Sequence, residues 1–272
     1  MLLKRVLVAI VLLPIGLAAI FAGGWYLTTL VGLFLGLAAW EYVTLFRTDG
    51  LQPAVVLVIG GTLLLLIGRN INGFEDVPWM ISLVILLSMA YHLVAYERGR
   101  DQAGTDFGVT LGGIFYIGWI GAYFMSLRSL PEGQWWMLVV LAGVMLADSG
   151  AYFIGRKFGR HKLAPRLSPK KTWEGYFGGI IIGVPLTALL AALIQMGVGT
   201  TSGITPLRGM LVGLVMALVP TLGDLGESMI KRQMGVKDSG NILPGHGGAF
   251  DRIDAWLWAV VIGYYMVFWL WS

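Results

Sequence analysis

The sequence predicts an all-α, multi-pass membrane protein, and three features of its composition lead to this fold class. Of its 272 residues, 57% are hydrophobic and 12% are charged, whereas soluble domains carry about 25% charged residues. Its 39 glycines are about twice the usual share of ~7%, as in bundles of closely packed membrane helices. The apolar runs are continuous and longer than the ~10-residue alternating strands of a membrane β-barrel. This composition excludes an ordinary soluble domain and a disordered chain, and the absence of Cys excludes disulfides and thiolate sites.

A membrane-spanning helix needs about 20 mainly apolar residues, and the first five candidates are separated by short connections. They are Val6–Ala22, Trp25–Leu45, Pro53–Ile67, Val77–Ala95 and Phe107–Ser126. The first follows Lys4 and Arg5, as the apolar part of a signal peptide would. No small-residue cleavage site follows it, so we expect a retained helix.

Four more candidate spans follow, two of them preceded by long polar loops. They are Gln134–Ile154, Tyr176–Met196, Leu207–Leu222 and Ile253–Trp271. With nine spans and a cytoplasmic N-terminus, 16 of the 19 Lys and Arg residues lie on the inner side. Because cytoplasmic loops carry an excess of Lys and Arg, we expect the N-terminus inside and the C-terminus outside. Loops 155–171 and 227–252 hold 11 of these basic residues, which also suits attraction to anionic lipids.

Three groups of acids lie within or at the ends of predicted spans, where ionisable residues are costly and usually functional. Asp148 lies near the inner end of the sixth span, Asp224 at the inner end of the eighth, and Asp251 at the start of the ninth. Glu227 follows Asp224, and Asp254 follows Asp251, each at helical i,i+3 spacing. Asp148 could instead hydrogen-bond across a helix interface, and Asp254 could simply complement a helix N-terminus.

The predicted topology brings these acids to the cytoplasmic boundary, where they would repel one another without a cation. A set of oxygen ligands suits a hard ion such as Mg²⁺, although a proton relay would use similar acids. In the neighbouring loops, Ser168 and Pro169 are typical of a helix start. Lys170 and Lys171 would then lie beside an anion-binding helix N-terminus, or they would be snorkelling lysines of a capped helix; the spacing favours neither. Glycines around His246, together with nearby basic residues, suit a polyphosphate. There is no Walker A sequence.

The motif between Ser228 and Asp254 resembles the signature of the phosphatidate cytidylyltransferases, or CDP-diacylglycerol synthases. It reads S-M-I-K-R, then K-D-S-G, then L-P-G-H-G-G, then D-R-I-D. The stretch S-P-K-K-T-W-E-G from Ser168 and the segment around Asp148 are also similar to the family. Ala249 departs from the larger apolar residue that is usual there.

The resemblance implies transfer of the cytidylyl group of CTP to phosphatidic acid, giving CDP-diacylglycerol and pyrophosphate. The reaction would depend on Mg²⁺, and a second cation would be compatible with it. It implies catalytic roles for Asp224, Asp251 and Lys231, and metal binding by Asp148, Asp224 and Asp251. It implies substrate binding by a larger polar set: Ser168, Lys170, Lys171, Glu174, Ser228, Lys231, Arg232, Lys237, Asp238, His246, Gly247 and Arg252. The expected partners are CTP, phosphatidic acid, membrane lipids and a second copy of the chain, without nucleic acid.

We therefore expect a single integral membrane domain over residues 1–272 in a bacterial inner membrane, with its active site facing the cytoplasm. Helices one to five (1–130) would form a scaffold. Helices six to nine with loops 155–171 and 227–252 would form the catalytic region.

A transporter for an anionic substrate is the main rival function, but no inverted repeat is visible and the polar groups cluster at one face rather than at the midplane. A CTP-using lipid kinase would release CDP instead of pyrophosphate, and the D-G-x-x-A-R motif of CDP-alcohol phosphotransferases is absent.

Overall fold

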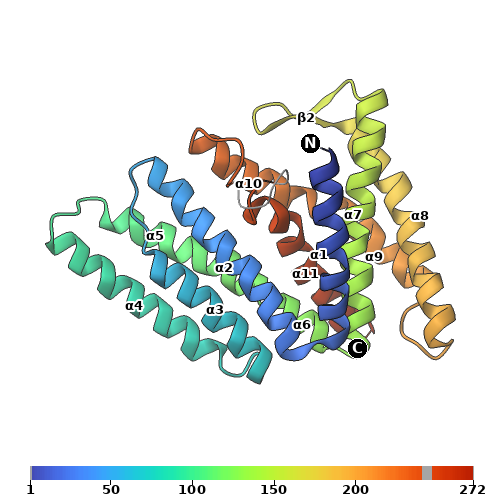
Figure 1. Ribbon diagram of the computed structural model, residues 1–272, viewed down its shortest axis with the longest axis horizontal. Helices are drawn as coiled ribbons and strands as arrows, with labels where there is room; N and C mark the ends of the chain where they lie inside the picture. Colours follow the sequence, from blue (N-terminus) through green and yellow to red (C-terminus); the bar gives the residue numbers. More distant parts are fainter. Residues whose placement is uncertain (1, 241–246, 272) are drawn as a thin grey trace. The chain divides into compact units, whose positions relative to one another are not determined.

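The computed structural model describes residues 2–240 and 247–271, with side chains from Ile10 onward. Its elements are almost all helices (Figure 1). The helices are α1 (Leu2–Ala22), α2 (Gly24–Thr48), α3 (Val55–Asn72), α4 (Val77–Glu97), α5 (Ala103–Gly113), the π-helical segment η1 (Ile114–Trp119), α6 (Tyr123–Ser129), α7 (Gly133–Phe158), α8 (Trp173–Val198), α9 (Pro206–Leu218), α10 (Thr221–Gln233) and α11 (Phe250–Trp271). Strands β1 (Lys162–Ala164) and β2 (Ser168–Thr172) form one hairpin. The all-α fold class is confirmed, with this hairpin as a small addition.

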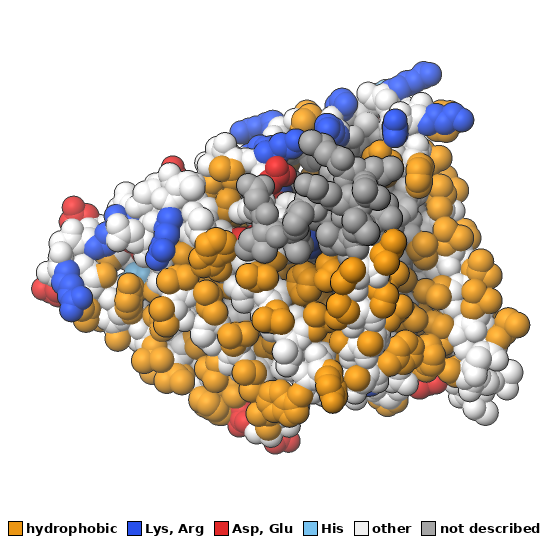
Figure 2. Space-filling model, viewed as in Figure 1, with side chains coloured by type: hydrophobic (Ala, Val, Ile, Leu, Met, Phe, Trp, Pro, Cys, Tyr) orange, Lys and Arg blue, Asp and Glu red, His pale blue; other side chains and the backbone are white. Residues whose placement is uncertain are grey.

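Eight helical stretches of the described residues are long and apolar enough to cross a membrane. Two of them combine several elements: α5, η1 and α6 form Ala103–Ser129, and α9 and α10 form Pro206–Gln233. The apolar part of α1, Ile10–Ala22, is shorter. Apolar side chains cover much of the exposed helix surface (Figure 2), including Met196 of α8 at 83% exposure. Such a surface suits lipid rather than water, so the protein is a multi-pass membrane protein. The side on which each terminus lies stays a prediction.

The chain folds into two compact units. The first contains Met1–Ser126 and Ile230–Ile253, and the second contains Leu127–Met229 and Asp254–Ser272. The predicted division at residue 130 lies close to the first boundary. However, the segment Ile230–Ile253, which we expected to act with the last four helices, folds with the first five. The assignment of separate scaffold and catalytic roles stays a prediction.

In the first unit, a buried ion pair ties together two of the connections between helices. The Asp106 carboxylate, on a residue that is 1% exposed, accepts a hydrogen bond from Arg100 Nε at 2.7 Å and from the backbone amide of Gln52 at 2.7 Å. The hydrogen bond to Asp106 raises the pKa of the Arg100 guanidinium. The pair therefore joins the α4–α5 connection to the α2–α3 connection.

The start of α11 is also held in the first unit, by packing around the fully buried ring of Phe250. Its centroid lies 6.1 Å from the ring of Tyr42 on α2 and 6.3 Å from that of Tyr116 in η1, both in edge-on geometry. Edge-to-face aromatic pairs are favourable beyond their buried area, by about 0.5–1.5 kcal/mol each. This packing holds the start of α11, which includes the next residue, Asp251.

In the second unit, small residues let α7, α8 and α9 pack side by side (Figure 1). A side-chain carbon at Gly183 of α8 would lie 2.8 Å from the Cα of Ala147 on α7, and one at Gly179 would lie 2.8 Å from its carbonyl oxygen. A side chain at Gly213 of α9 would meet Thr187 of α8 at 2.8 Å. Such contacts are typical of membrane helices that associate through glycine, and they set the position of Asp148 beside Ala147.

The predicted helix start at Ser168 and Pro169 is wrong, because these residues open strand β2 instead. Ser168 pairs with Ala164 and Thr172 with Lys162 in antiparallel register. Pro169 lacks an amide hydrogen but is tolerated on the edge of a two-stranded ribbon. Helix α8 begins at Trp173, and its N-cap is Thr172, whose hydroxyl oxygen accepts the Gly175 amide at 3.2 Å.

The eighth span is interrupted, whereas the sequence predicted a continuous helix over Leu207–Leu222. Helix α9 ends at Leu218, and α10 begins at Thr221. Pro220 lies in the break, where its missing amide hydrogen and its ring oppose a continuous helix. Asp224 is therefore in the first turn of α10, rather than at the cytoplasmic end of an unbroken span.

Candidate active site

Three charged residues from three elements meet in the second unit. The Nζ atom of Lys171, at the end of β2, lies 2.5 Å from Oδ2 of Asp224 in α10. Asp148 of α7 is close enough for its carboxylate to be repelled by that of Asp224 and attracted by the Lys171 ammonium. The structure thus brings together two of the three predicted metal ligands and one of the predicted phosphate-binding lysines.

The break between α9 and α10 is stabilised by Tyr176 of α8. The Leu222 amide donates to the Val219 carbonyl at 2.9 Å, so the Leu218 carbonyl lacks the helical partner that Leu222 would supply in a continuous helix. The Tyr176 hydroxyl donates to that carbonyl at 3.0 Å. Inside a membrane an unpaired carbonyl is costly, so this hydrogen bond supports the turn that places Asp224.

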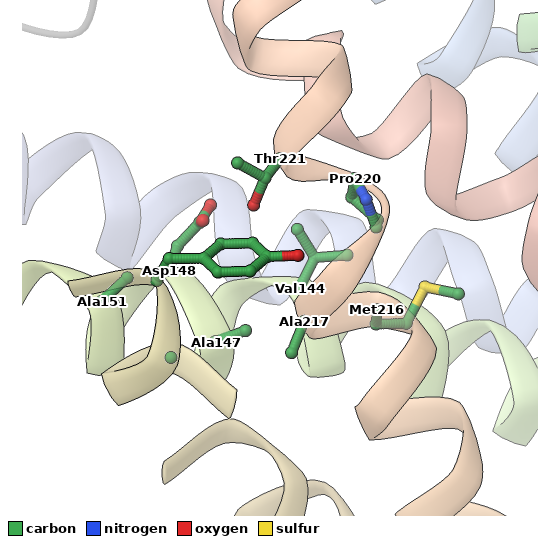
Figure 3. A pocket seen from close by; sticks show the side chains of 10 residues that line it. Val144, Ala147, Asp148, Ala151, Met216, Ala217, Pro220 and Thr221 are labelled. Carbon is green, nitrogen blue, oxygen red and sulfur yellow. The ribbon is translucent and has the colours of Figure 1, made fainter. Parts of the chain in front are cut away.

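A small cavity lies at this break, with about 260 Å³ of unfilled space including its open side. Its wall includes Asp148 of α7, Tyr176 of α8, and Pro220 and Thr221 of the break. Figure 3 shows the side chains of Asp148 and Thr221 directed toward the same space. A carboxylate and a hydroxyl therefore face an opening in an otherwise apolar helix bundle.

A second carboxyl pair lies close to Asp224 in the second unit. Glu227 of α10 is 2% exposed, and it is hydrogen-bonded to Asp254 of α11. Asp224 is near enough to interact with Asp254 electrostatically. Neither Glu227 nor Asp254 was assigned to the site from the sequence, although their spacing from Asp224 and Asp251 was the signal that could have identified them.

A separate polar cluster forms in the first unit around Asp251. Its Oδ1 atom lies 2.6 Å from Lys231 Nζ, and the side chains are only 6% and 10% exposed. Its Oδ2 atom accepts the backbone amides of Ser239 at 3.0 Å and Gly248 at 2.8 Å. Two predicted catalytic residues are therefore joined directly. In this arrangement the Lys231 ammonium faces Asp251, and its predicted contact with a substrate phosphate stays a prediction.

The remaining predicted substrate-binding residues lie mainly at the surface of their units. Glu174, in the first turn of α8, accepts the backbone amides of Arg160 at 3.0 Å and His161 at 3.2 Å, so it holds the start of the hairpin. Ser168 and Ser228 are half-buried, and Gly247 has a positive φ of 83°. The exposed members are Lys170, Arg232, Lys237, Asp238 and Arg252. His246 lies outside the described residues. Their roles in binding stay predictions.

The chemistry of the site in the second unit suits Mg²⁺. Within the described parts of the chain, no three His, Asp or Glu side chains are grouped so that they could hold a metal ion by themselves. Mg²⁺, however, is commonly bound by one or two carboxylates, with waters and substrate phosphates completing its shell. The neighbouring carboxylates of Asp148 and Asp224 match that donor set. Asp251 belongs to the other unit, and its predicted role as a ligand is untested.

These features define a multi-pass membrane protein that holds carboxylates and lysines inside its helical units. A sequence profile of the cytidylyltransferase family matches residues 3–270. The chain belongs to this family.

Bacterial relatives of the chain carry the name phosphatidate cytidylyltransferase. The protein from Staphylococcus epidermidis is 35% identical over 94% of this chain and 95% of its own length. The protein from Synechocystis is 29% identical over 97% of this chain and 96% of its own. The protein from Bacillus subtilis is 36% identical over 72% of this chain and 70% of its own. The resemblance found in the motifs therefore extends over nearly the whole chain.

Proposed function

We propose that this protein transfers the cytidylyl group of CTP to phosphatidic acid, yielding CDP-diacylglycerol and pyrophosphate. The observation that carries the proposal is the cluster of Asp148, Lys171 and Asp224 in the second unit, in which two carboxylates and a cation lie near one another and Asp148 lines an opening. It is supported by full-length similarity to relatives named for this reaction.

The reaction requires the protein to bring two polyanions, CTP and phosphatidic acid, together. An oxygen of the lipid phosphate monoester attacks the α-phosphorus of CTP, a new P–O bond forms, and the bond to the β-phosphate breaks to release pyrophosphate. The attacking group is already an anion, because its second pKa is about 6, so no general base is required. Catalysis then rests on positioning and on neutralising charge.

The residues of the two polar clusters would have different roles in this reaction. Asp148 and Asp224 would hold Mg²⁺, which supplies charge neutralisation at the phosphates. Lys171, Lys231 and the other basic residues predicted to bind substrate, Lys170, Arg232, Lys237 and Arg252, would bind phosphate oxygens. A second cation, the pairing of two copies and a location in the bacterial inner membrane are parts of the same proposal. Because CTP is dissolved in water, the site would open toward the cytoplasm.

The test is pyrophosphate release by the purified protein in mixed micelles that contain phosphatidic acid. We expect release with CTP and Mg²⁺, little release with ATP, GTP or UTP, and none when phosphatidic acid is omitted. Removing Mg²⁺ with EDTA should stop the reaction, and adding it back should restore it. Formation of CDP instead of pyrophosphate would indicate a lipid kinase. Anion uptake by proteoliposomes without pyrophosphate release would indicate a transporter.

A further inference from the structure

A buried glutamate in the N-terminal half of the chain contacts the signature motif directly. Glu41 lies in α2 and is 1% exposed. Its Oε2 atom accepts the backbone amide of Phe250 at 2.9 Å and lies 3.0 Å from the hydroxyl of Ser239. All three residues belong to the first unit. A residue from the predicted scaffold is therefore hydrogen-bonded to two separate parts of the motif, at Ser239 and at Phe250, the residue before Asp251.

Ser239 connects this glutamate to Asp251. The Ser239 hydroxyl lies 3.0 Å from Oε2 of Glu41 and also 3.0 Å from Oδ2 of Asp251, so it stands between the two carboxylates and its single hydrogen can be donated to either. Asp251 in turn pairs with Lys231 at 2.6 Å. Glu41, Ser239, Asp251 and Lys231 thus form one continuous chain of polar contacts. Ser239 is itself 7% exposed, so this chain is shielded from solvent and each of its bonds is correspondingly stronger.

Two glycines of the motif make room for Glu41. A side-chain carbon at Gly240 would lie 2.5 Å from Oε1 of Glu41, and one at Gly248 would clash with both Glu41 and Ser239. In the sequence the glycines around His246, which include Gly248, suggested close approach of a ligand to the backbone. In the structure, the group that occupies the space beside them is the carboxylate of Glu41.

We propose that Glu41 is a positioning residue for the cytidylyl transfer reaction. By binding Ser239 and Phe250 it holds the two sides of the motif together, and it thereby fixes Asp251 and its partner Lys231 in one geometry. Glu41 itself does not contact substrate. The proposal rests on the function proposed above, because it assigns Glu41 a role in placing residues of that reaction.

Two conservative substitutions separate positioning from a requirement for charge. Glu41→Gln removes the charge but keeps the length, and its amide oxygen can accept the same two hydrogen bonds. Glu41→Asp keeps the charge but is one methylene shorter, so it cannot reach Ser239 and Phe250 together. Asp106→Asn is the matched control, because Asp106 is an equally buried carboxylate of the same unit, paired with Arg100.

We expect Glu41→Asp to lower kcat about 10- to 100-fold, as when supporting residues around a site are changed. Glu41→Gln and Asp106→Asn should keep kcat within about threefold of the parent protein. Hydrogen–deuterium exchange at the Phe250 amide gives a readout that does not depend on activity. It should be about fivefold faster in Glu41→Asp, the equivalent of one lost hydrogen bond of about 1 kcal/mol, and unchanged in Glu41→Gln.

Normal kcat and normal exchange in Glu41→Asp would overturn the proposal. An equal loss of activity in Glu41→Gln and Glu41→Asp would also overturn it, because the charge would then be the essential property. If the parent protein released no pyrophosphate, the proposed function would fail, whereas the exchange comparison would still decide whether Glu41 holds the motif.

Discussion

The Nζ atom of Lys171 lies 2.5 Å from Oδ2 of Asp224, and this ion pair joins the end of a strand to the first turn of a helix. Neither element boundary follows from hydropathy, because β2 replaces a predicted helix start and α10 begins at an interruption of a predicted span. The position of Asp224 therefore depends on both the hairpin and the break.

Asp224→Asn should lower kcat by at least ~100-fold while the protein stays folded. Asn has the shape of Asp but lacks the charge that pairs with Lys171 and that would bind Mg²⁺, and changes around a metal site commonly cost 10- to 100-fold even at supporting residues. Pyrophosphate release measures the effect, and thermal melting in detergent confirms the fold. Asp101→Asn, at an exposed turn, is the control. Near-normal turnover of the Asp224→Asn variant would refute the assignment.

Tyr176→Phe should destabilise the protein by about 1 kcal/mol, the usual net value of one hydrogen bond. Its hydroxyl is the donor to the Leu218 carbonyl at the helix break, and a loss of this size lowers Tm by about 2–4 °C in a protein of roughly 150–250 residues. Activity should fall as well, because the break positions Asp224. Tyr152→Phe is the matched control, since Tyr152 is exposed and its hydroxyl accepts a hydrogen bond from Arg156 at 3.2 Å. Equal melting temperatures for the two variants would contradict the role of Tyr176.

Lys231→Met should raise the Michaelis constant for CTP or phosphatidic acid by about tenfold or more, in line with loss of a charged hydrogen bond worth about 1.5–3 kcal/mol. It should also destabilise the protein by about 3–5 kcal/mol, because Asp251 would lose the cation of a buried pair. Steady-state kinetics and thermal melting measure the two effects. Lys157→Met, at an exposed position, should change neither quantity. Unchanged Michaelis constants for both substrates would argue against phosphate binding by Lys231.

Gly183→Ala should destabilise the contact between α7 and α8 by about 1–3 kcal/mol, the typical cost of overpacking. The added carbon would lie 2.8 Å from Ala147 Cα, so α8 would have to move away from the helix that carries Asp148. Gly197→Ala makes the same change in the same helix, where no atom lies within 4 Å. That control should be neutral or slightly stabilising, because Ala favours helix over Gly. Thermal melting of both variants gives the comparison, and equal stability would contradict the packing argument.

Most of the helices could be predicted because their signal is local. A run of about 20 apolar residues is sufficient to indicate a span, and the predicted Val77–Ala95 is nearly the observed α4. The errors lie where a polar or proline-containing segment can adopt more than one local structure. Pro169 is compatible with both a first helical turn and an edge strand, and Pro220 near the end of an apolar run can either end or interrupt a helix.

The candidate site could be predicted only as a set of residue types. Asp148, Asp224 and Asp251 were recognisable because acids are rare inside membrane spans. Their partners were not recognisable, since a partner is defined by a contact and not by spacing. Glu41 illustrates this limit: it is one acid inside the predicted span Trp25–Leu45, and its partner Ser239 lies 198 positions away in the chain.

The sequence by itself determined the membrane class, the approximate bounds of the spans and the family resemblance, because hydropathy and motif identity are properties of neighbouring residues. The tertiary structure alone decided which charges pair. It joined Lys171 to Asp224 across 53 positions and Lys231 to Asp251 across 20, and it placed Glu41 against the two glycines of the motif. The physical reason is clearest for Lys231 and Asp251, whose side chains are 10% and 6% exposed: a buried charge is stable only beside a compensating group, and folding, rather than sequence separation, selects that group.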